Sequence, residues 1–170
     1  MGAPDPPAIR IKPLGPQHDR GAFCCGNDQI DAFCRDRAQK DHDRYRTRVF
    51  VACPDASNVV VGFYSLSVRS IAPRTILNIG FGSWDIPGVY LGMIGVCQDV
   101  AKGGIGSALM LDAFTRTLKV AENAGTYCLW LTAIDEERAA WYAARDFVRM
   151  EPGKLDMYVP VETIRAVLAE

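Results

Sequence analysis

Hydrophobic and polar positions follow two different periods along the chain. Runs of β-branched and aromatic residues are typical of strands, and they predict strands within residues 47–55, 58–73, 89–96, 126–134 and 154–161. Apolar residues spaced three and four positions apart are typical of helices, and they predict helices in the middle of 22–48, from about 105 to Gly125, and within 135–147 and 162–170. About residues 1–20, which are interrupted by prolines, are expected to be irregular.

The order of these elements indicates the fold class. The first two strands are separated by a short turn at 54–58, which favours a hairpin, whereas the later strand–helix–strand order favours a parallel crossover. Because both connections occur in one chain, we expect an α/β (α+β) protein with a mixed sheet flanked by helices. No repeat or linker divides the sequence, so residues 1–170 are expected to form a single domain.

Composition narrows the classes of partner and the cellular compartment. A net charge of −1 and an apolar content of 49% give no global reason to bind nucleic acid or a membrane. The sequence has no apolar run that could span a bilayer and no signal-peptide core, so we expect a cytoplasmic protein without a membrane partner. Its 6 cysteines lack the spacing of a metal site or a disulfide framework, and we expect no metal.

A glycine-rich turn lies between the strand at 89–96 and the helix that follows it. A strand that runs into such a turn presents unpaired backbone N–H groups and the positive end of a helix dipole, which together attract an anion. Gly106 is followed by Ser107 and Ala108, so the lysine of a Walker loop is absent. Leu109 stands where a dinucleotide-binding fingerprint needs its third glycine. The alternative is a plain strand-to-helix turn.

The segment LGMIGVCQDVAKGGIGSALM resembles the acyl-CoA-binding motif of the GCN5-related N-acetyltransferases, the GNAT superfamily. In that family a strand ending in L-x-V leads into a loop of pattern Q/R-x-x-G-x-G/A, and the helix after it receives the CoA diphosphate. Ala101 stands where the family prefers Gln or Arg, which implies weaker CoA binding. The resemblance implies that acetyl-CoA is the co-substrate and that it is bound by Ile94, Gly95, Val96, Ala101, Lys102, Gly103, Gly104, Ile105, Gly106 and Ser107.

A second motif of the same superfamily follows in the expected order. Tyr142 is followed five residues later by Phe147, and Asp146 replaces the usual glycine, which Asp can partly imitate at a left-handed helix end. The resemblance implies a GNAT fold, with a mixed sheet of about six or seven strands splayed between the two motif strands. It also implies that Tyr142 is the catalytic acid that protonates the CoA sulfur, and that N–H groups near 94–96 stabilise the oxyanion. Without the resemblance, a half-buried aromatic on a helix face is the alternative for Tyr142.

The N-terminal half resembles one GNAT branch, the toxins of toxin–antitoxin modules. Enzymes of this branch acetylate the α-amine of the amino acid on charged tRNA and so block translation, which implies charged tRNA and a small ribbon-helix-helix antitoxin as partners. Met93, Gly95 and Cys97 depart from the Arg, Ala and Asp of the branch motif. The match is carried by Phe23, Cys25, Gly26, Asp31, Phe33, Arg48, Phe50, Val51, Gly62, Tyr64, Ser65, Leu66, Pro87, Leu91 and Gly92.

Cations crowd the predicted helix and the strand after it. Arg37, Lys40 and Arg44 would line one side of the helix, and with Arg48 and Ser65 they are the candidate contacts for the charged tRNA. Because aspartates are interleaved with these cations, a salt-bridged helix face is the alternative.

Several points stay open at this stage. No general base is evident, since Glu122, Asp135, Glu136 and His42 are each candidates. An aminoacyl ester amine is more acidic than an ordinary amine, which suits a site without a strong base. Two other functions remain alternatives: a housekeeping acetyltransferase for a small-molecule or protein amine, and a CoA-binding regulatory module with weak catalysis. A homodimer is also left open.

Overall fold

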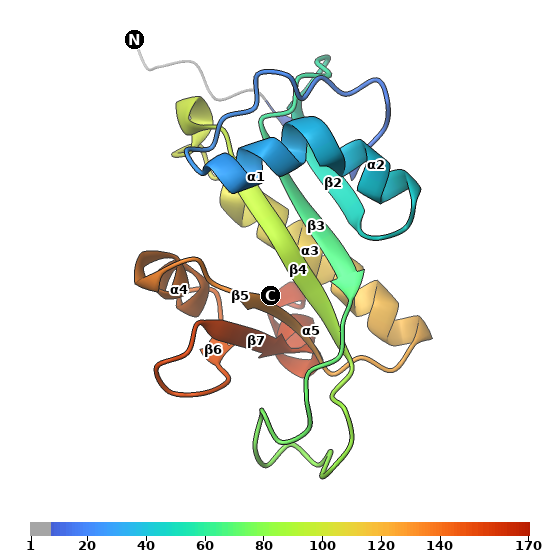
Figure 1. Ribbon diagram of the computed structural model, residues 1–170, viewed down its shortest axis with the longest axis vertical. Coiled ribbons are helices and arrows are strands. Elements are labelled where there is room, and N and C mark those ends of the chain that lie inside the picture. The colour runs from blue at the N-terminus through green and yellow to red at the C-terminus, as the bar shows by residue number, and fades with distance from the viewer. Residues whose placement is uncertain (1–7) are drawn as a thin grey trace. The chain divides into compact units, whose positions relative to one another are not determined.

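The computed structural model describes residues 8–170 and contains a seven-stranded mixed sheet (Figure 1). The strand order is β1-β2-β3-β4-β5-β7-β6. This confirms the predicted fold class, including a mixed sheet of six or seven strands flanked by helices. The strands are β1 (Ile9–Pro13), β2 (Arg48–Pro54), β3 (Gly62–Val68), β4 (Gly88–Val96), β5 (Cys128–Thr132), β6 (Val148–Arg149) and β7 (Asp156–Pro160).

Helices form in each region where the apolar spacing predicts one. The helix after the glycines ends at Asn123, two residues before the predicted stop. Within residues 8–170, no helix is long and apolar enough to cross a bilayer. The helical elements are α1 (Asp28–Ala32), the π-helical segment η1 (Phe33–Arg37), α2 (Ala38–Asp43), the 3-10 turn η2 (Gln98–Val100), α3 (Ile105–Asn123), α4 (Glu136–Ala143) and α5 (Val161–Leu168).

The sheet is mixed because of the way its strands pair. β2 runs antiparallel to β1 and to β3, as the predicted hairpin requires, and β7 runs antiparallel to β5 and to β6. β4 and β5 are parallel and are joined by the crossover helix α3. The predicted hairpin and crossover are therefore both present.

The described chain divides into two compact units. Unit 1 comprises residues up to 66 together with 93–112, and unit 2 comprises 67–92 and 113–170. β3, β4 and α3 run from one unit into the other. In unit 1 the helices α1 to α2 cover one face of the first strands (Figure 1), and Phe23, Phe33 and Phe63 pack together in its core. The single-domain expectation for residues 1–170 stays a prediction.

Two expectations about strands were wrong. β1 lies inside the stretch expected to be irregular; an edge strand pairs on one side only, so it tolerates the proline at its end. The predicted strand at 58–73 is shorter, because the chain leaves the sheet after Val68. Residues 69–87 form a loop whose isoleucines pack with Cys128 of β5 in one apolar cluster, and Ile71 pairs with Ile86. Residues 1–7 of the expected irregular stretch lie outside the described residues.

The predicted N-terminal helix is made of three consecutive segments. Asn27 caps α1, since its side chain accepts the Ile30 N–H at 3.1 Å. In η1 the helix widens, and Arg20 Nη1 donates to the carbonyls of Cys34 at 2.6 Å and Arg35 at 3.1 Å. A long-range cation thus satisfies carbonyls in the widened turn, which apolar spacing alone does not predict.

Candidate acyl-transfer site

The carboxyl end of β4 is held against β3 by alternate backbone N–H groups. The Met93 N–H donates to Ser65 Oγ at 3.0 Å, and the Cys97 N–H donates to the Val61 carbonyl at 2.8 Å. Both acceptors belong to β3 or to the residue just before it. Odd-numbered N–H groups in this part of β4 therefore point toward β3.

The intervening N–H groups face the opposite edge of β4. Successive N–H groups of a strand point to opposite edges, so those of Ile94 and Val96 point away from β3. On that edge the register with β5 ends at the pair Tyr90↔Trp130. The strand thus presents two N–H donors beyond the end of its ladder, the arrangement that an oxyanion needs.

Gly95, between these donors, is required by packing. A β-carbon there would lie 2.9 Å from Ile30 Cγ2, 3.2 Å from Phe23 Cζ and 3.4 Å from Cys25 Sγ. The alanine that the family motif carries at this position has no room here, because α1 and the segment before it pack against β4. This departure from the motif therefore has a structural cause.

The glycine loop leads from η2 into the first turn of α3. Gly104 has a φ of +81°, which favours glycine, and a β-carbon there would meet open space. The first bond into the helix is from the Ala108 N–H to the Gly104 carbonyl, at 3.1 Å. Within residues 8–170, the N–H groups of Gly104, Ile105 and Gly106 have no hydrogen-bond partner. With the exposed Lys102 nearby in sequence, they give the helix start the unpaired donors that the predicted anion site requires, and the binding itself stays a prediction.

Helix α4 positions Tyr142 in unit 2. Asp135 caps the helix by accepting the Arg138 N–H at 2.8 Å. At its other end the carbonyl of Tyr142 accepts the Phe147 N–H at 3.3 Å, and Asp146 has a φ of +72°. Asp146 therefore occupies the left-handed position expected of it, which confirms that part of the motif.

The Tyr142 side chain is surrounded by aromatic rings and is 7% exposed. Its ring centroid lies 5.2 Å from that of Trp141 and 5.5 Å from that of Phe147. Burial raises the pKa of Tyr142 to about 12, against the opposing charge of Arg138. Because its pKa is about 12, the hydroxyl is protonated at neutral pH, and since it has no hydrogen-bond partner within residues 8–170 it is free to donate.

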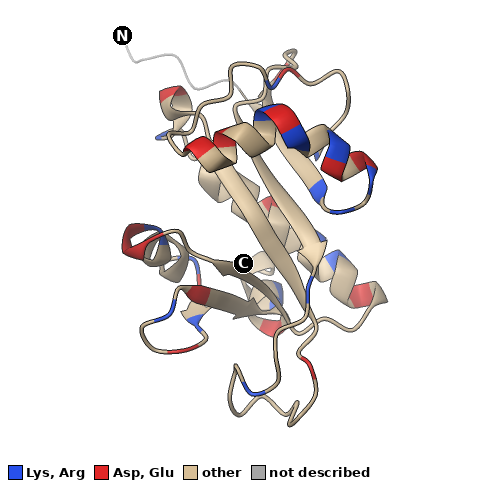
Figure 2. Ribbon diagram, in the orientation of Figure 1, with Lys and Arg blue, Asp and Glu red and all other residues tan. Residues whose placement is uncertain are grey.

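The predicted tRNA contacts differ in their surroundings. Ser65 is buried and accepts the N–H from β4 described above. Arg37 pairs with the buried Asp41 at 3.3 Å, whereas Lys40 and Arg44 are exposed and have no ion pair in the described chain. Arg48 donates to a backbone carbonyl of α2 at 3.0 Å. Figure 2 shows acidic and basic residues interleaved along α1 to α2, and a basic turn after α2.

The candidate general bases mostly have structural partners. His42 Nδ1 accepts the Val49 N–H at 2.9 Å, and Glu136 pairs with Arg149 in unit 2. Asp135 caps α4. Only Glu122, which is exposed, has no such partner among residues 8–170. This arrangement favours a substrate amine that is neutral without help from a strong base.

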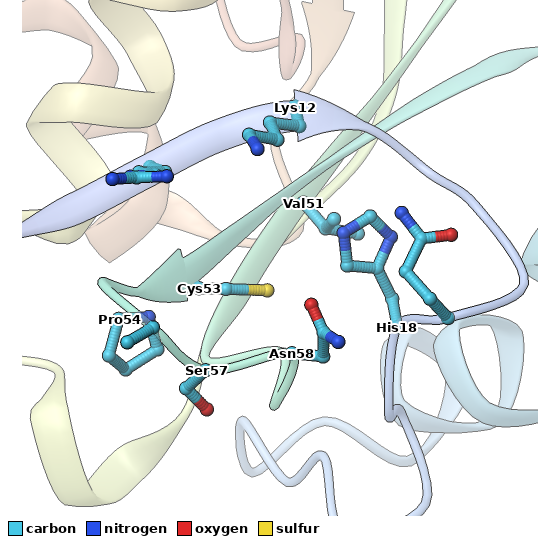
Figure 3. A pocket seen from close by; sticks show the side chains of 10 residues that line it. Lys12, His18, Val51, Cys53, Pro54, Ser57 and Asn58 are labelled. Carbon is cyan, nitrogen blue, oxygen red and sulfur yellow. The ribbon is translucent and has the colours of Figure 1, made fainter.

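A cavity of about 130 Å³ opens beside β1 and β2 in unit 1 (Figure 3). His18 Nδ1 accepts the Gly15 N–H at 2.9 Å, and Arg10 pairs with Asp55 at 2.8 Å. None of the site residues predicted from the sequence lines this cavity. Its lining comes from segments far apart in sequence, which no motif links: Arg10, Lys12, Gln17, His18, Val51, Cys53, Pro54, Ala56, Ser57 and Asn58.

Comparison with known proteins places the chain in a family. No family model matches it. It is 34% identical over 170 residues to the probable toxin TacT of Sinorhizobium fredii (strain NBRC 101917 / NGR234), and the match covers 93% of this chain and 94% of that protein. The chain belongs to the GNAT toxins of toxin–antitoxin modules.

One further relative and two solved structures with the same fold resemble this GNAT toxin. A tRNA-acetylating toxin of Mycobacterium tuberculosis (strain ATCC 25618 / H37Rv) is 28% identical over 157 residues, covering 89% of this chain and 92% of that protein. The toxin AtaT superposes with a TM-score of 0.86 at 18% identity in its complex with acetyl-methionyl-tRNAfMet, over 95% of this chain and 99% of that one. A tyrosine-to-phenylalanine mutant of AtaT, bound to acetyl-CoA and the C-terminus of the antitoxin AtaR, superposes with a TM-score of 0.83 at 18% identity, again over 95% and 99%.

Proposed function

We propose that this GNAT toxin transfers an acetyl group from acetyl-CoA to the α-amine of the amino acid on charged tRNA, and so blocks translation. The observation that carries the acetyl-transfer step is the end of β4. There two N–H donors, of Ile94 and Val96, point away from β3, and the helix start that follows the glycine loop has unpaired first N–H groups. A thioester carbonyl and a diphosphate are the two groups that such a strand end and helix start would hold.

The reaction needs three things from the chain. As the neutral amine attacks the thioester carbon, the carbonyl oxygen gains negative charge, which the N–H groups of Ile94 and Val96 stabilise. The carbon–sulfur bond then breaks, and Tyr142 gives its proton to the departing thiolate. The amine nitrogen releases its extra proton to solvent and forms the amide. We propose that CoA is held by residues 94–96 and 101–107.

The acceptor is proposed from the relatives. The Mycobacterium tuberculosis relative is named as a tRNA-acetylating toxin, and AtaT has been solved with an acetylated methionyl-tRNA. An aminoacyl ester amine also loses its proton more readily than an ordinary amine, and most of the candidate bases in this chain have structural partners. Lys40 and Arg44 are proposed as phosphate contacts because no acid of the described chain pairs with them.

The cellular setting follows from this acceptor. We propose that the protein acts in the cytoplasm, where charged tRNA is found. An antitoxin is proposed as its inhibitor, since AtaT has been solved with the C-terminus of AtaR. A homodimer remains part of the proposal.

The test is acetyl transfer to a mixture of charged tRNAs with radiolabelled acetyl-CoA. Mild alkali should release the label as N-acetyl amino acid, and uncharged tRNA should take up none. A polyamine and a peptide amine serve as competing acceptors. Label on the polyamine or the peptide but not on charged tRNA would show that the protein is a housekeeping acetyltransferase and not a toxin that acts on charged tRNA. Acetyl-CoA binding without turnover on any amine would show that the protein is a CoA-binding regulatory module.

A further inference from the structure

Tyr45 occupies a backbone position that does not favour a tyrosine. It follows the end of α2 with a φ of +56°, in the left-handed region. Helices normally place Gly or Asn there, because a β-carbon is disfavoured in this conformation. The side chain of Tyr45 is 80% exposed, so burial of its ring does not offset that cost.

The turn that presents Tyr45 is fixed by its neighbours. The Tyr45 N–H donates to the His42 carbonyl at 3.1 Å, and the Arg46 N–H donates to the Asp41 carbonyl at 3.0 Å. The buried Asp41 carboxylate also pairs with Arg37 at 3.3 Å and with Arg46 at 3.4 Å. Arg37 and Arg46 are thus paired with an acid that fixes the turn.

One face of the Tyr45 ring carries a cation, and the ring is otherwise open. The Arg48 guanidinium carbon lies 5.0 Å from the ring centroid, and the same guanidinium is anchored to the His42 carbonyl at 3.0 Å. Since most of the ring is exposed, its other face is open to solvent. A flat aromatic surface backed by arginine is a surface on which a nucleic-acid base stacks.

Two further cations, one in α2 and one at its end, are uncompensated. Lys40 and Arg44 are four residues apart, so they lie on one side of α2. Both are exposed, and neither has an ion pair within residues 8–170. The acid next to Arg44, Asp43, accepts a hydrogen bond from Gln39 at 2.9 Å. An open aromatic ring close in sequence to unpaired cations is a combination that single-stranded nucleic acid binds.

The turn is also connected to the end of β4. Thr47 Oγ1 donates to the Leu66 carbonyl of β3 at 2.8 Å. The residue before Leu66, Ser65, accepts the Met93 N–H of β4. Adjacent strands lie about 4.8 Å apart, so the start of β2 is roughly 10 Å from β4 across the sheet. The start of β2 therefore lies within about two strand spacings of the part of β4 that carries the proposed oxyanion donors.

We propose that Tyr45 stacks on an unpaired base near the aminoacylated end of the RNA, while Lys40 and Arg44 hold the neighbouring phosphates. This inference rests on the proposed function, because it takes charged tRNA as the substrate. It adds a contact that no motif contains and that does not touch the reacting atoms.

The deciding variant is Tyr45→Gly, because it separates folding from binding. Glycine relieves the left-handed backbone, so the melting temperature should stay the same or rise. The KM for charged tRNA should rise about tenfold through loss of stacking, with kcat and the KM for acetyl-CoA unchanged. Tyr45→Trp, the matched control, should keep the wild-type KM. Lys40→Gln and Arg44→Gln should each lower the salt dependence of RNA binding by about one unit of slope, whereas Tyr45→Gly should not.

A direct probe is an RNA hairpin that carries 2-aminopurine at an unpaired nucleotide of its 3′ end. Its fluorescence should be quenched by the wild-type protein and by Tyr45→Phe, but not by Tyr45→Gly. If the wild-type protein acetylates charged tRNA while Tyr45→Gly leaves both KM and quenching unchanged, the stacking proposal is wrong. The proposal is also wrong if Tyr45→Gly loses as much affinity for a blunt RNA duplex, which has no unpaired base, as it loses for the hairpin. If the wild-type protein acetylates no charged tRNA, the proposed function itself fails.

Discussion

The glycine loop of unit 1 and helix α4 of unit 2 present their proposed chemistry by different means. Around the loop, the groups offered to a ligand are backbone N–H groups, on the last residues of β4 and on the first turn of α3. On α4 the group offered is one side-chain hydroxyl, held among aromatic rings. Backbone N–H donors are kept when most side chains are substituted, whereas a side-chain hydroxyl is lost with a single substitution. The loop can therefore carry an atypical Ala101, while α4 depends on Tyr142.

Removing the hydroxyl of Tyr142 should have the largest effect. For Tyr142→Phe we expect kcat for acetyl transfer to charged tRNA to fall about a hundredfold or more, the usual contribution of a positioned acid. The affinity for acetyl-CoA, measured by calorimetry, should stay unchanged, because the backbone donors are intact. Expression of this variant should no longer arrest growth.

A matched control for this change is Tyr158→Phe, which removes another hydroxyl from unit 2. The pKa of Tyr158 is also raised by burial, but the residue lies on β7 and no step is assigned to it. It should retain wild-type kcat. If Tyr142→Phe lost less than about tenfold in kcat, Tyr142 would not be the acid.

A change to the loop should be milder and should appear in binding. Gly104 has a φ of +81°, so Gly104→Ala forces a β-carbon into a conformation that costs about 1–2 kcal/mol. We expect the Kd for acetyl-CoA to rise about tenfold, with kcat at saturating acetyl-CoA little changed. Gly125→Ala, beyond the other end of α3, is the control, because a β-carbon there meets open space without a positive φ. A fall in kcat without a change in Kd would contradict this division of roles.

Acid should weaken unit 1 through its two histidines. Burial lowers the pKa of His18 and of His42 below the ordinary 6.5, and each ring accepts a backbone N–H through Nδ1. The unfolded chain therefore takes up protons first as the pH falls, so this stability is complete above about pH 6.5 and is lost below it. Each such bond contributes about 1 kcal/mol. The melting temperature should drop by a few degrees between pH 7.5 and pH 5.5.

The variant His42→Asn tests this cause. Its amide oxygen takes the place of Nδ1 and can still accept the Val49 N–H, yet it does not titrate in this range. The variant should therefore lose less stability on acidification than the wild type. Equal melting temperatures of the wild type at the two pH values would show that neither histidine is responsible.

The sequence predicts those features whose signal is local. The glycine loop, the strand before it and the left-handed Asp146 are each written in a few consecutive residues, and the structure contains all three. Apolar spacing likewise finds every helix of more than one turn. The wider turn at η1 was not found, because its carbonyls are satisfied by Arg20, more than a dozen residues away.

Features that depend on distant partners were beyond the sequence. Ser65 matches a family motif, but only the structure shows that its hydroxyl holds the Met93 N–H. His42 was a candidate base until its ring was found to accept the Val49 N–H. β1 was missed because prolines weaken the strand pattern, although an edge position tolerates them. In each case the decisive partner lies at least several residues away in the chain.

The smallest expected effect comes from restoring the family residue at the edge of the loop. Ala101 is exposed at the end of η2, so a longer side chain meets no packing there. Ala101→Gln should lower the Kd for acetyl-CoA about twofold to fivefold through one added hydrogen bond, with kcat unchanged. Ala101→Arg should lower it further at low salt, because its charge adds attraction to a phosphate that salt screens. If neither variant binds acetyl-CoA more tightly, the backbone donors already supply all of the binding at this edge, and the difference between the loop and α4 is larger than proposed.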